Sequence, residues 1–232
     1  MDKLTGIIGA MDEEVELLLA AMGGEAETEQ VAGVAFTTGM IYGRSVVVCK
    51  SGVGKVNAAV TTQILVDRYD VERVIFTGVA GAVDPDLNVG DIVISTSCVH
   101  HDMDVTALGY EHGVIPYQEV SSFAADPALV ELAEQACREL HYHYLTGIVL
   151  SGDQFIADRE HVLWLHKQLN GSCTEMEGAA VAQACHMNGV PFLILRSMSD
   201  KADGSAHISF EQFTVEAARR SHHIVANMLE HL

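Results

Sequence analysis

Residues 174–180 read TEMEGAA, and residues 193–203 read LILRSMSDKAD. The first stretch opens a predicted helix of small residues and carries two carboxylates, Glu175 and Glu177. The second is an apolar strand that ends in Ser199 and Asp200. Ligands of open α/β sheets bind at the carboxyl ends of strands and at the helix starts beside them. We therefore expect the two stretches to meet at one ligand site.

Apolar strands alternate with helices along the remaining chain. Strands are predicted over residues 4–10, 34–39, 45–49, 74–82, 91–96, 145–150 and 192–198. Helices are predicted from residues 11–14 through Met22, from the strand-to-helix turn at 51–59 to about Tyr69, over 127–140, over 158–169 and from about 209 to 232, the last capped by Ser209. Such alternation is typical of a mostly parallel sheet covered by helices on both faces. We expect one domain over residues 1–232, because no linker or repeat interrupts the pattern.

The charge balance limits the kind of ligand. The chain has 13 Lys and Arg against 32 Asp and Glu, a formal charge of −19. Nucleic-acid binding depends on clustered Lys and Arg, so a nucleic-acid partner is not expected. A neutral or zwitterionic small molecule fits this composition better than a highly phosphorylated one.

The five cysteines and the amino-terminal residues indicate the compartment. An odd number of cysteines without C-x-x-C spacing favours free thiols in a reducing environment. The first residues lack a signal-peptide pattern, and no apolar run approaches the length of a membrane span. We expect a cytoplasmic protein with no membrane partner.

Three familiar site types are disfavoured by spacing. The twelve histidines form no H-x-x-x-H or Cys/His set, so no metal is assigned. Gly54-Lys55 suggests a phosphate loop, but Cys49 and Val56 occupy the positions where that loop needs glycine and Ser or Thr. The chain also has no G-x-S-x-G elbow of a serine hydrolase.

Acidic residues at strand ends remain: Glu14, Glu175, Glu177 and Asp200. Singly, each of these residues is more often a helix cap or a solvated side chain. Together, separated carboxylates around a sugar suit glycosidic cleavage, because one can activate water and another can protonate the leaving group.

Several motifs occur in the order found in one enzyme family. They are GIIGAMDEEV at 6–15, SGVGKV at 51–56, VGDIV at 89–93, DMDVTALGY at 102–110, SGD at 151–153, EME at 175–177 and Ser199-Asp200. In this combination the chain resembles the 5′-methylthioadenosine/S-adenosylhomocysteine nucleosidases from end to end. The resemblance implies a three-layer α/β/α nucleoside phosphorylase-like fold with a central mixed, mostly parallel sheet.

The resemblance also implies an activity without a cofactor. The N-glycosidic bond of 5′-methylthioadenosine or S-adenosylhomocysteine would be hydrolysed to adenine and a 5′-thioribose, with 5′-deoxyadenosine as a further candidate. Asp200, held by Ser199, would protonate adenine N7, and Glu14 would activate water. This acid role requires that Asp200 hold a proton near neutral pH, which burial beside other carboxylates favours.

By the same resemblance, substrate contacts surround these acids. Glu177 would hold the ribose hydroxyls above Met176, while Phe155 would stack on adenine and the Ile156 backbone would read its edge. The other implied substrate-binding residues are Glu175, Val53, Met11, Ala80, Gly81, Arg196, Phe210 and Val105.

The polar segment around residues 100–116 has little periodicity, and long loops of this kind are usually functional or lie at a subunit contact. The resemblance implies a homodimer in which Leu108, Tyr110 and Pro116 close the 5′ pocket of a neighbouring subunit. Val79 lies where some relatives have Ser and Leu108 where some have Phe, so the preference among 5′ substituents stays open.

Other functions remain as alternatives. Phosphorolytic relatives carry an arginine where this chain has Phe76, so water is expected as the nucleophile. An aminofutalosine nucleosidase, a purine nucleoside phosphorylase and a non-enzymatic nucleoside sensor are the alternative interpretations. Comparing turnover with and without phosphate separates the phosphorylase from the nucleosidases, and adenine binding without adenine release would favour the sensor.

Overall fold

The structure is a computed structural model that describes residues 3–202 and 206–232. Its strands are β1 (Thr5–Gly9), β2 (Gly23–Val31), β3 (Val34–Ile41), β4 (Arg44–Lys50), β5 (Arg73–Ala82), β6 (Ile92–His100), β7 (Ser122–Ala124), β8 (Tyr144–Ser151), β9 (Gly171–Glu175) and β10 (Phe192–Asp200). Its helices are α1 (Asp12–Ala21), α2 (Lys55–Tyr69), η1 (Thr106–Leu108), α3 (Pro127–Glu139), α4 (Arg159–Leu169), α5 (Gly178–Asn188) and α6 (Ala206–His231).

Parallel strands form the centre of the sheet. β1 lies between β4 and β5 and is parallel to both, and β10 runs parallel to β5 on the other side. These strands are the buried apolar runs of the sequence: β1, for example, is buried along its whole length. Such continuous apolar runs are typical of parallel strands that are covered on both faces.

The sheet closes on itself at one end. β5 pairs with β10, β10 with β6, β6 with β8, β8 with β9, and β9 with β5. At the other end β4, β3 and β2 continue the sheet as an antiparallel meander. The prediction of a mixed sheet is therefore confirmed, although antiparallel pairing is more frequent than the alternation of strands and helices suggests.

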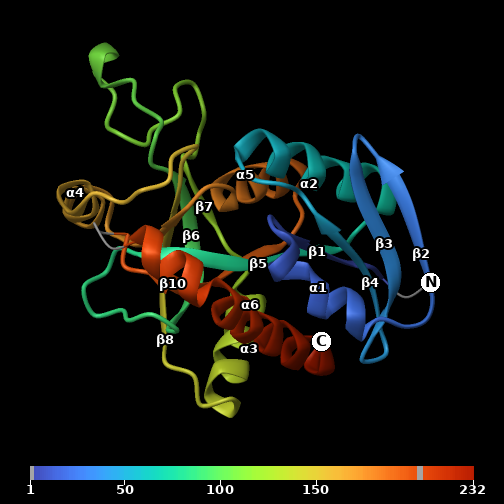
Figure 1. The fold of residues 1–232 in the computed structure, drawn as a ribbon. Coiled ribbons are helices and arrows are strands. Elements are labelled where there is room, and N and C mark those ends of the chain that lie inside the picture. The colour runs from blue at the N-terminus through green and yellow to red at the C-terminus, as the bar shows by residue number, and fades with distance from the viewer. Residues whose placement is uncertain (1–2, 203–205) are drawn as a thin grey trace.

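Helices cover both faces of the sheet (Figure 1). α2 and α5 pack together on one face, whereas α1 and α3 pack against α6 on the other. The small residues of α5, including Ala179, Ala180 and Ala182, are buried and permit this close packing. The fold thus has three layers, and α1, α2 and α5 each begin a few residues after the carboxyl end of a strand.

The main differences from the sequence prediction are three strands and the start of α6. β2 was not predicted because its sequence GGEAETEQV is polar, as suits an exposed edge strand. β7 and β9 are short, and the small polar residues of β9 (GSCTE) give little strand signal although all five are buried. α6 begins at Ala206, so Ser209 lies inside the helix and does not cap it.

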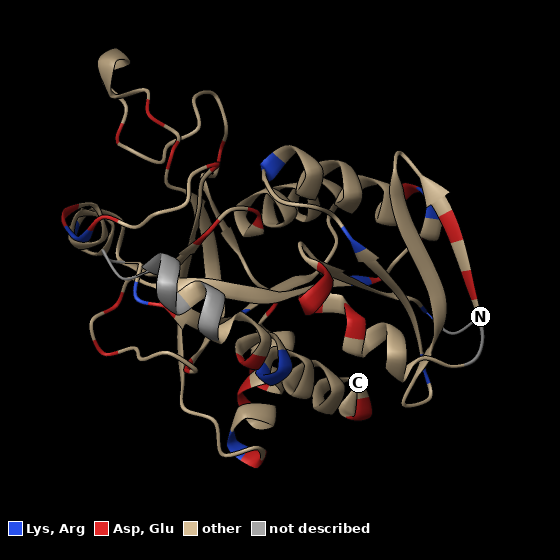
Figure 2. Cartoon of the chain, in the orientation of Figure 1, with Lys and Arg blue, Asp and Glu red and all other residues tan. Residues whose placement is uncertain are grey.

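Acidic residues are spread over the molecule. Figure 2 shows Asp and Glu along β2, α1 and the loops, with few Lys and Arg among them. Within the described residues, no helix is long and apolar enough to cross a membrane.

Candidate active site

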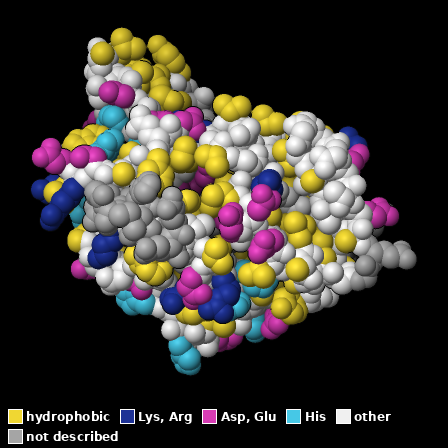
Figure 3. Space-filling model, in the orientation of Figure 1, with side chains coloured by type: hydrophobic (Ala, Val, Ile, Leu, Met, Phe, Trp, Pro, Cys, Tyr) yellow, Lys and Arg dark blue, Asp and Glu magenta, His cyan; other side chains and the backbone are white. Residues whose placement is uncertain are grey.

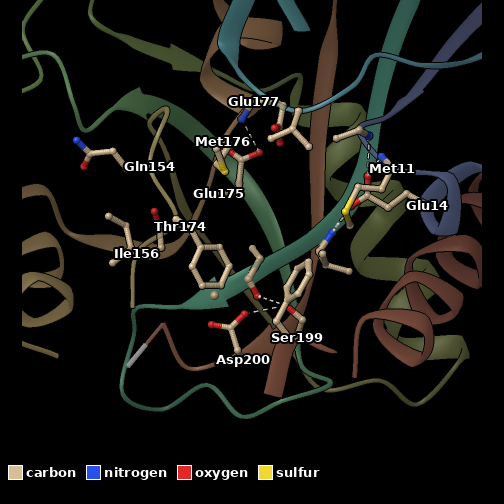
Figure 4. Close-up of a pocket in the computed structure, with 17 residues that line it drawn as sticks. Met11, Glu14, Gln154, Ile156, Thr174, Glu175, Met176, Glu177, Ser199 and Asp200 are labelled. Carbon is tan, nitrogen blue, oxygen red and sulfur yellow. Dashed lines mark hydrogen bonds between the residues drawn. The ribbon is translucent and has the colours of Figure 1, made fainter. Parts of the chain in front are cut away.

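A cavity of about 330 Å³ opens at the carboxyl ends of the central strands (Figure 4). The loops that follow β1, β4 and β8, the ends of β5, β9 and β10, and the residues just before α5 all reach it. Its walls are formed by Ala10, Met11, Glu14, Val53, Val79, Ala80, Gly81, Gln154, Phe155, Ile156, Thr174, Glu175, Met176, Glu177, Ser199, Asp200 and Phe210. The cavity therefore brings together both stretches with which the sequence analysis began.

Most of the expected site residues lie in this wall, and Ala10, Val79, Gln154 and Thr174, which were not expected as contacts, join them. Ala10 lies inside the motif at 6–15, and Gln154 lies between the SGD motif and Phe155, so these motifs are the signal that could have found them. Val79 and Thr174 lie on neighbouring strands of the closed sheet, β5 and β9. Thr174 opens the stretch at 174–180, although its strand was not predicted.

The Glu14 carboxylate is buried and fixed by main-chain donors. One oxygen accepts the N–H groups of Ala10 at 2.6 Å and Met11 at 3.0 Å, and the other accepts the N–H of Val79 at 2.9 Å. Burial raises the pKa of Glu14, although nearby Arg196 and these N–H groups oppose the shift. A carboxylate with a raised pKa is a stronger base, so this geometry suits proton acceptance from water.

Glycine at position 78 makes room for that carboxylate. A Cβ atom on Gly78 would lie 2.5 Å from Glu14 Oε1 and 3.0 Å from Arg196 Nη1. Since real Cβ atoms do not approach so closely, any side chain at this point of β5 would displace Glu14.

Glu175 and Arg196 form a buried ion pair behind the cavity. Arg196 Nη2 lies 2.6 Å from Glu175 Oε2, and the guanidinium stacks on the Phe76 ring at 3.9 Å. Glu175 also accepts the Ser151 hydroxyl and the N–H of Gly178. Arg196 lies outside the cavity wall, and the Glu175 carboxylate is occupied by these partners, so both are suited to holding the start of α5 in place.

Glu177 is the next carboxylate in the wall. Its Oε1 accepts the N–H of Gly54 at 2.7 Å, which joins α5 to the turn between β4 and α2. Burial, followed by the charge of Glu175, raises the pKa of Glu177 to about 8. The site therefore stabilises the neutral form of this carboxyl group when no ligand is bound.

Asp200 ends β10 and is buried at 2% exposure. The Ser199 hydroxyl donates to Asp200 Oδ2 at 2.9 Å, and the N–H of Ala202 donates to Oδ1 at 2.7 Å. Ser199 Oγ also lies 3.4 Å from the carbonyl oxygen of Ala80. These contacts fix the orientation of the carboxyl group at the cavity.

The acids occupy different sides of the cavity. Figure 4 shows Glu14 with Met11 on one side, Asp200 with Ser199 on another, and Glu177 with Met176 on a third. Apolar side chains fill much of the wall between them, and Phe155 packs edge-to-face on Phe210 with ring centroids 5.7 Å apart. A flat apolar ring with polar edges fits such a space.

Besides Arg196, four expected contact residues lie outside the cavity of this chain. Val105, Leu108, Tyr110 and Pro116 belong to the segment between β6 and β7, which projects from the body of the molecule (Figure 1). Leu108 is 73% exposed there. Closure of a neighbouring subunit's pocket by this segment stays a prediction.

This fold and this site define a class of protein. Residues 5–230 match the family model described as the phosphorylase superfamily. The chain therefore belongs to that superfamily, whose nucleoside phosphorylase-like fold was expected.

Similar proteins define the family more closely. The chain is 46% identical over 228 residues to a 5′-methylthioadenosine/S-adenosylhomocysteine nucleosidase of Bacillus thuringiensis (strain Al Hakam), covering 97% of this chain and 98% of that protein. A crystal structure of the nucleosidase of that name from Neisseria meningitidis, in complex with methylthio-immucillin-A, has a TM-score of 0.95 at 39% identity and covers 99% of this chain and 100% of its own. This chain belongs to the 5′-methylthioadenosine/S-adenosylhomocysteine nucleosidase family.

A third similar protein carries another name. The futalosine hydrolase of Helicobacter pylori has a TM-score of 0.95 at 34% identity, covering 99% of this chain and 98% of its own.

Proposed function

We propose that this chain hydrolyses the N-glycosidic bond of 5′-methylthioadenosine and S-adenosylhomocysteine, releasing adenine and the 5′-thioribose. The observation that carries the proposal is the placement of Glu14 and Asp200 on different sides of one largely apolar cavity. Such a pair can act on both sides of a glycosidic bond, one on the water and one on the leaving group.

Asp200 acts as the acid in this proposal. Adenine leaves readily only as a neutral base, so a proton must reach N7 while the bond to the sugar breaks. The Ser199 hydroxyl and the N–H of Ala202 hold the Asp200 carboxyl group in one orientation. Fixed orientation keeps the proton directed at the base, with Phe155 and the main chain of Ile156 positioning the ring.

Glu14 acts as the base on the attacking water. The N–H groups of Ala10, Met11 and Val79 fix its two oxygens. The raised pKa of Glu14 increases its affinity for the proton that the water loses as it attacks the sugar.

Glu177 holds the ribose hydroxyl groups, and Met176 packs beneath the sugar. A carboxylate can accept hydrogen bonds from two neighbouring hydroxyls at once, and both hydroxyls are donors. The N–H of Gly54 already occupies part of Oε1 and fixes its direction. Apolar Met11, Val53 and Met176 surround the sugar end and suit a thioether substituent.

Water is the nucleophile in this proposal. In the described residues, the cavity wall contains Glu14, Glu175, Glu177 and Asp200 and no Lys or Arg. Such a wall offers phosphate no cationic side chain, whereas phosphate sites are built from cationic groups or main-chain N–H donors.

We also propose that the protein is a cytoplasmic homodimer. The projecting segment that contains η1 carries hydrophobic side chains on its surface (Figure 3), among them Leu108 and Tyr117, which are 73% and 95% exposed. Exposed apolar groups of this size favour burial against a second subunit. The cysteines are free and buried, as suits a reducing compartment.

The first experiment measures adenine release from 5′-methylthioadenosine in phosphate-free buffer and again with phosphate. Hydrolysis predicts equal release in both buffers. Asp200→Asn is expected to lose turnover while still binding the nucleoside, as calorimetry would show. A phosphate requirement would contradict the water nucleophile, and near wild-type turnover by Asp200→Asn would contradict its role as acid.

Aminofutalosine hydrolysis is a second candidate function, favoured by the likeness to the Helicobacter pylori futalosine hydrolase. Both substrates are 5′-substituted adenine nucleosides and would use the same acids. Comparison of kcat/KM for aminofutalosine and 5′-methylthioadenosine at one pH distinguishes the two functions.

A further inference from the structure

A lysine at the start of α2 is unexpected. Lys55 is the first residue of α2, and a cation at a helix amino terminus opposes the helix dipole. The spacing around it also rules out a phosphate loop. The Lys55 ammonium instead lies 2.6 and 2.7 Å from the two carboxylate oxygens of Asp102, and both side chains are largely buried.

Asp102 and Lys55 belong to a closed set of contacts with a third residue, Asp153. The N–H of Asp153 donates to Asp102 Oδ2 at 3.1 Å, and Asp153 Oδ1 accepts the main-chain N–H of Lys55 at 2.8 Å. Each of the three residues thus contacts both of the others. We call this set the Lys55 network.

The Lys55 network joins three loops that are far apart in sequence. Lys55 follows the turn after β4, Asp102 follows β6, and Asp153 follows β8. Asp102 stands at the start of the projecting segment described above.

Two of these loops end in the active site. Gly54, the neighbour of Lys55, donates its N–H to Glu177 at 2.7 Å. Phe155, two residues after Asp153, lies in the cavity wall. Gly54 has a φ of 101°, and a Cβ there would lie 3.2 Å from Asp153 Oδ1, so the turn fits closely against the network.

We propose that Lys55, Asp102 and Asp153 are positioning residues, which hold the Gly54 N–H against Glu177 and the Phe155 loop against the cavity. This inference rests on the proposed nucleosidase function. None of the three residues lies in the cavity wall, so they act through Gly54, Glu177 and Phe155 rather than on the substrate.

The charges of the network support a strong contact. Burial alone would raise the pKa of Asp102, but Lys55 and the N–H of Asp153 hold that pKa below its usual value. Asp102 therefore stays ionised and paired at neutral pH. Charge-assisted hydrogen bonds of this kind are stronger than neutral ones and fix geometry.

The test compares Lys55→Met, Asp102→Asn and the double variant of the whole protein. Kinetics of adenine release from 5′-methylthioadenosine give kcat and KM for each. We expect each single change to raise KM about tenfold, and the double change to raise it no further, because either change breaks the same network.

The pH profile is the second readout. The Gly54 N–H and the Arg196 charge favour the charged form of Glu177. The charges of Glu175 and Glu14 disfavour that form. When the Gly54 N–H is displaced, the low-pH limb of kcat/KM should move to higher pH. A merely structural loss of folded protein would lower activity without moving that limb.

Lys50→Met is the matched control. Lys50 contacts both oxygens of Asp12 at 2.8 and 2.9 Å, but this ion pair is exposed. Its removal should leave KM and the pH profile unchanged.

The proposal is overturned if Lys55→Met and Asp102→Asn keep the wild-type KM and pH profile, or if their effects on KM multiply in the double variant. Thermal melting identifies a variant that fails to fold. If Lys55→Met fails to fold, the KM and pH profile of Asp102→Asn, which preserves side-chain size, decide the test. If the wild type releases no adenine, the proposed function fails and the network is tested separately.

Calorimetry then measures adenine binding to the same variants. Weaker binding is expected, and unchanged binding would contradict the role of the network.

Discussion

At the scale of single residues, the Glu14 carboxylate combines burial with fixed main-chain donors. Its N–H partners Ala10 and Met11 come from the loop that follows β1, and Val79 comes from β5. These donors hold the carboxylate in place without neutralising it by direct ion pairing. Such a fixed, dehydrated carboxylate is well suited to act as a base.

Glu14→Gln should therefore lower kcat for adenine release by about 10²–10⁴, the range typical of a lost general base. Nucleoside binding, measured by calorimetry, should change much less. Glu13→Gln is the control, since Glu13 is the exposed neighbour in the same helical turn. A Glu14→Gln enzyme with wild-type kcat would contradict the assignment of the base.

A second prediction concerns Glu177 and the stability of the ligand-free protein. Burial and the Glu175 charge raise the pKa of Glu177 from 4.5 to about 8. Between these values the native state holds a proton that the unfolded chain has released. The free energy of unfolding therefore falls as pH rises through this interval.

Thermal melting of wild type and Glu177→Gln near pH 5 and near pH 8 tests this dependence. From pH 5 to pH 8 the melting temperature of the wild type should fall further than that of the variant. The gap should be roughly 2–4 °C for each kcal/mol of difference in the free energy of unfolding. Glu14, whose pKa is also raised, is present in both proteins. Parallel pH curves for the two proteins would show that Glu177 titrates normally.

At the scale of elements, the site depends on how closely β5 approaches α1. Gly78 lies on β5, and its missing side chain leaves the space that Glu14 occupies. The identity of one strand residue thus fixes the position of an acid that lies far away in sequence.

Gly78→Ala should displace Glu14 and Arg196, since its Cβ would lie 2.5 Å and 3.0 Å from their side chains. We expect kcat to fall at least about tenfold and the free energy of unfolding to fall by about 1–3 kcal/mol. Gly23→Ala is the control, because nothing lies within 4 Å of a Cβ there. Equal kinetics of the two variants would show that Gly78 is not required.

At the scale of the whole molecule, the projecting segment between β6 and β7 contributes nothing to the cavity of its own chain. Its exposed apolar side chains, of which Leu108 is an example, support the proposed homodimer. A second subunit is then needed to complete the 5′ side of the site.

Leu108→Glu should weaken the dimer, because it places a charge in a surface that dimerisation would dehydrate. Sedimentation should show monomer, and KM for 5′-methylthioadenosine should rise about tenfold, as for a lost hot-spot side chain. Val215→Glu is the matched control, because Val215 lies on α6 and is 67% exposed. A wild type that sediments as a monomer with full activity would refute the role of the segment.

Much of the site was predictable because its residues occupy short motifs at the ends of strands. Glu14, Glu177 and Asp200 come from three such motifs, and all lie in one cavity. The strand that carries Thr174 was not predictable, since β9 is too short and polar to show strand periodicity. The family and the layered α/β fold expected from the motifs are confirmed.

The sequence by itself indicated most of the local elements and the acidic residues at strand ends, because apolar periodicity and strand-end motifs depend on neighbouring residues. Only the tertiary structure decided that β10 pairs with both β5 and β6 and that the sheet closes through β8 and β9. Strand partners are chosen by hydrogen bonding and burial between segments that are distant in the chain. That long-range choice, together with the Lys55 network, brings the separate motifs to one cavity.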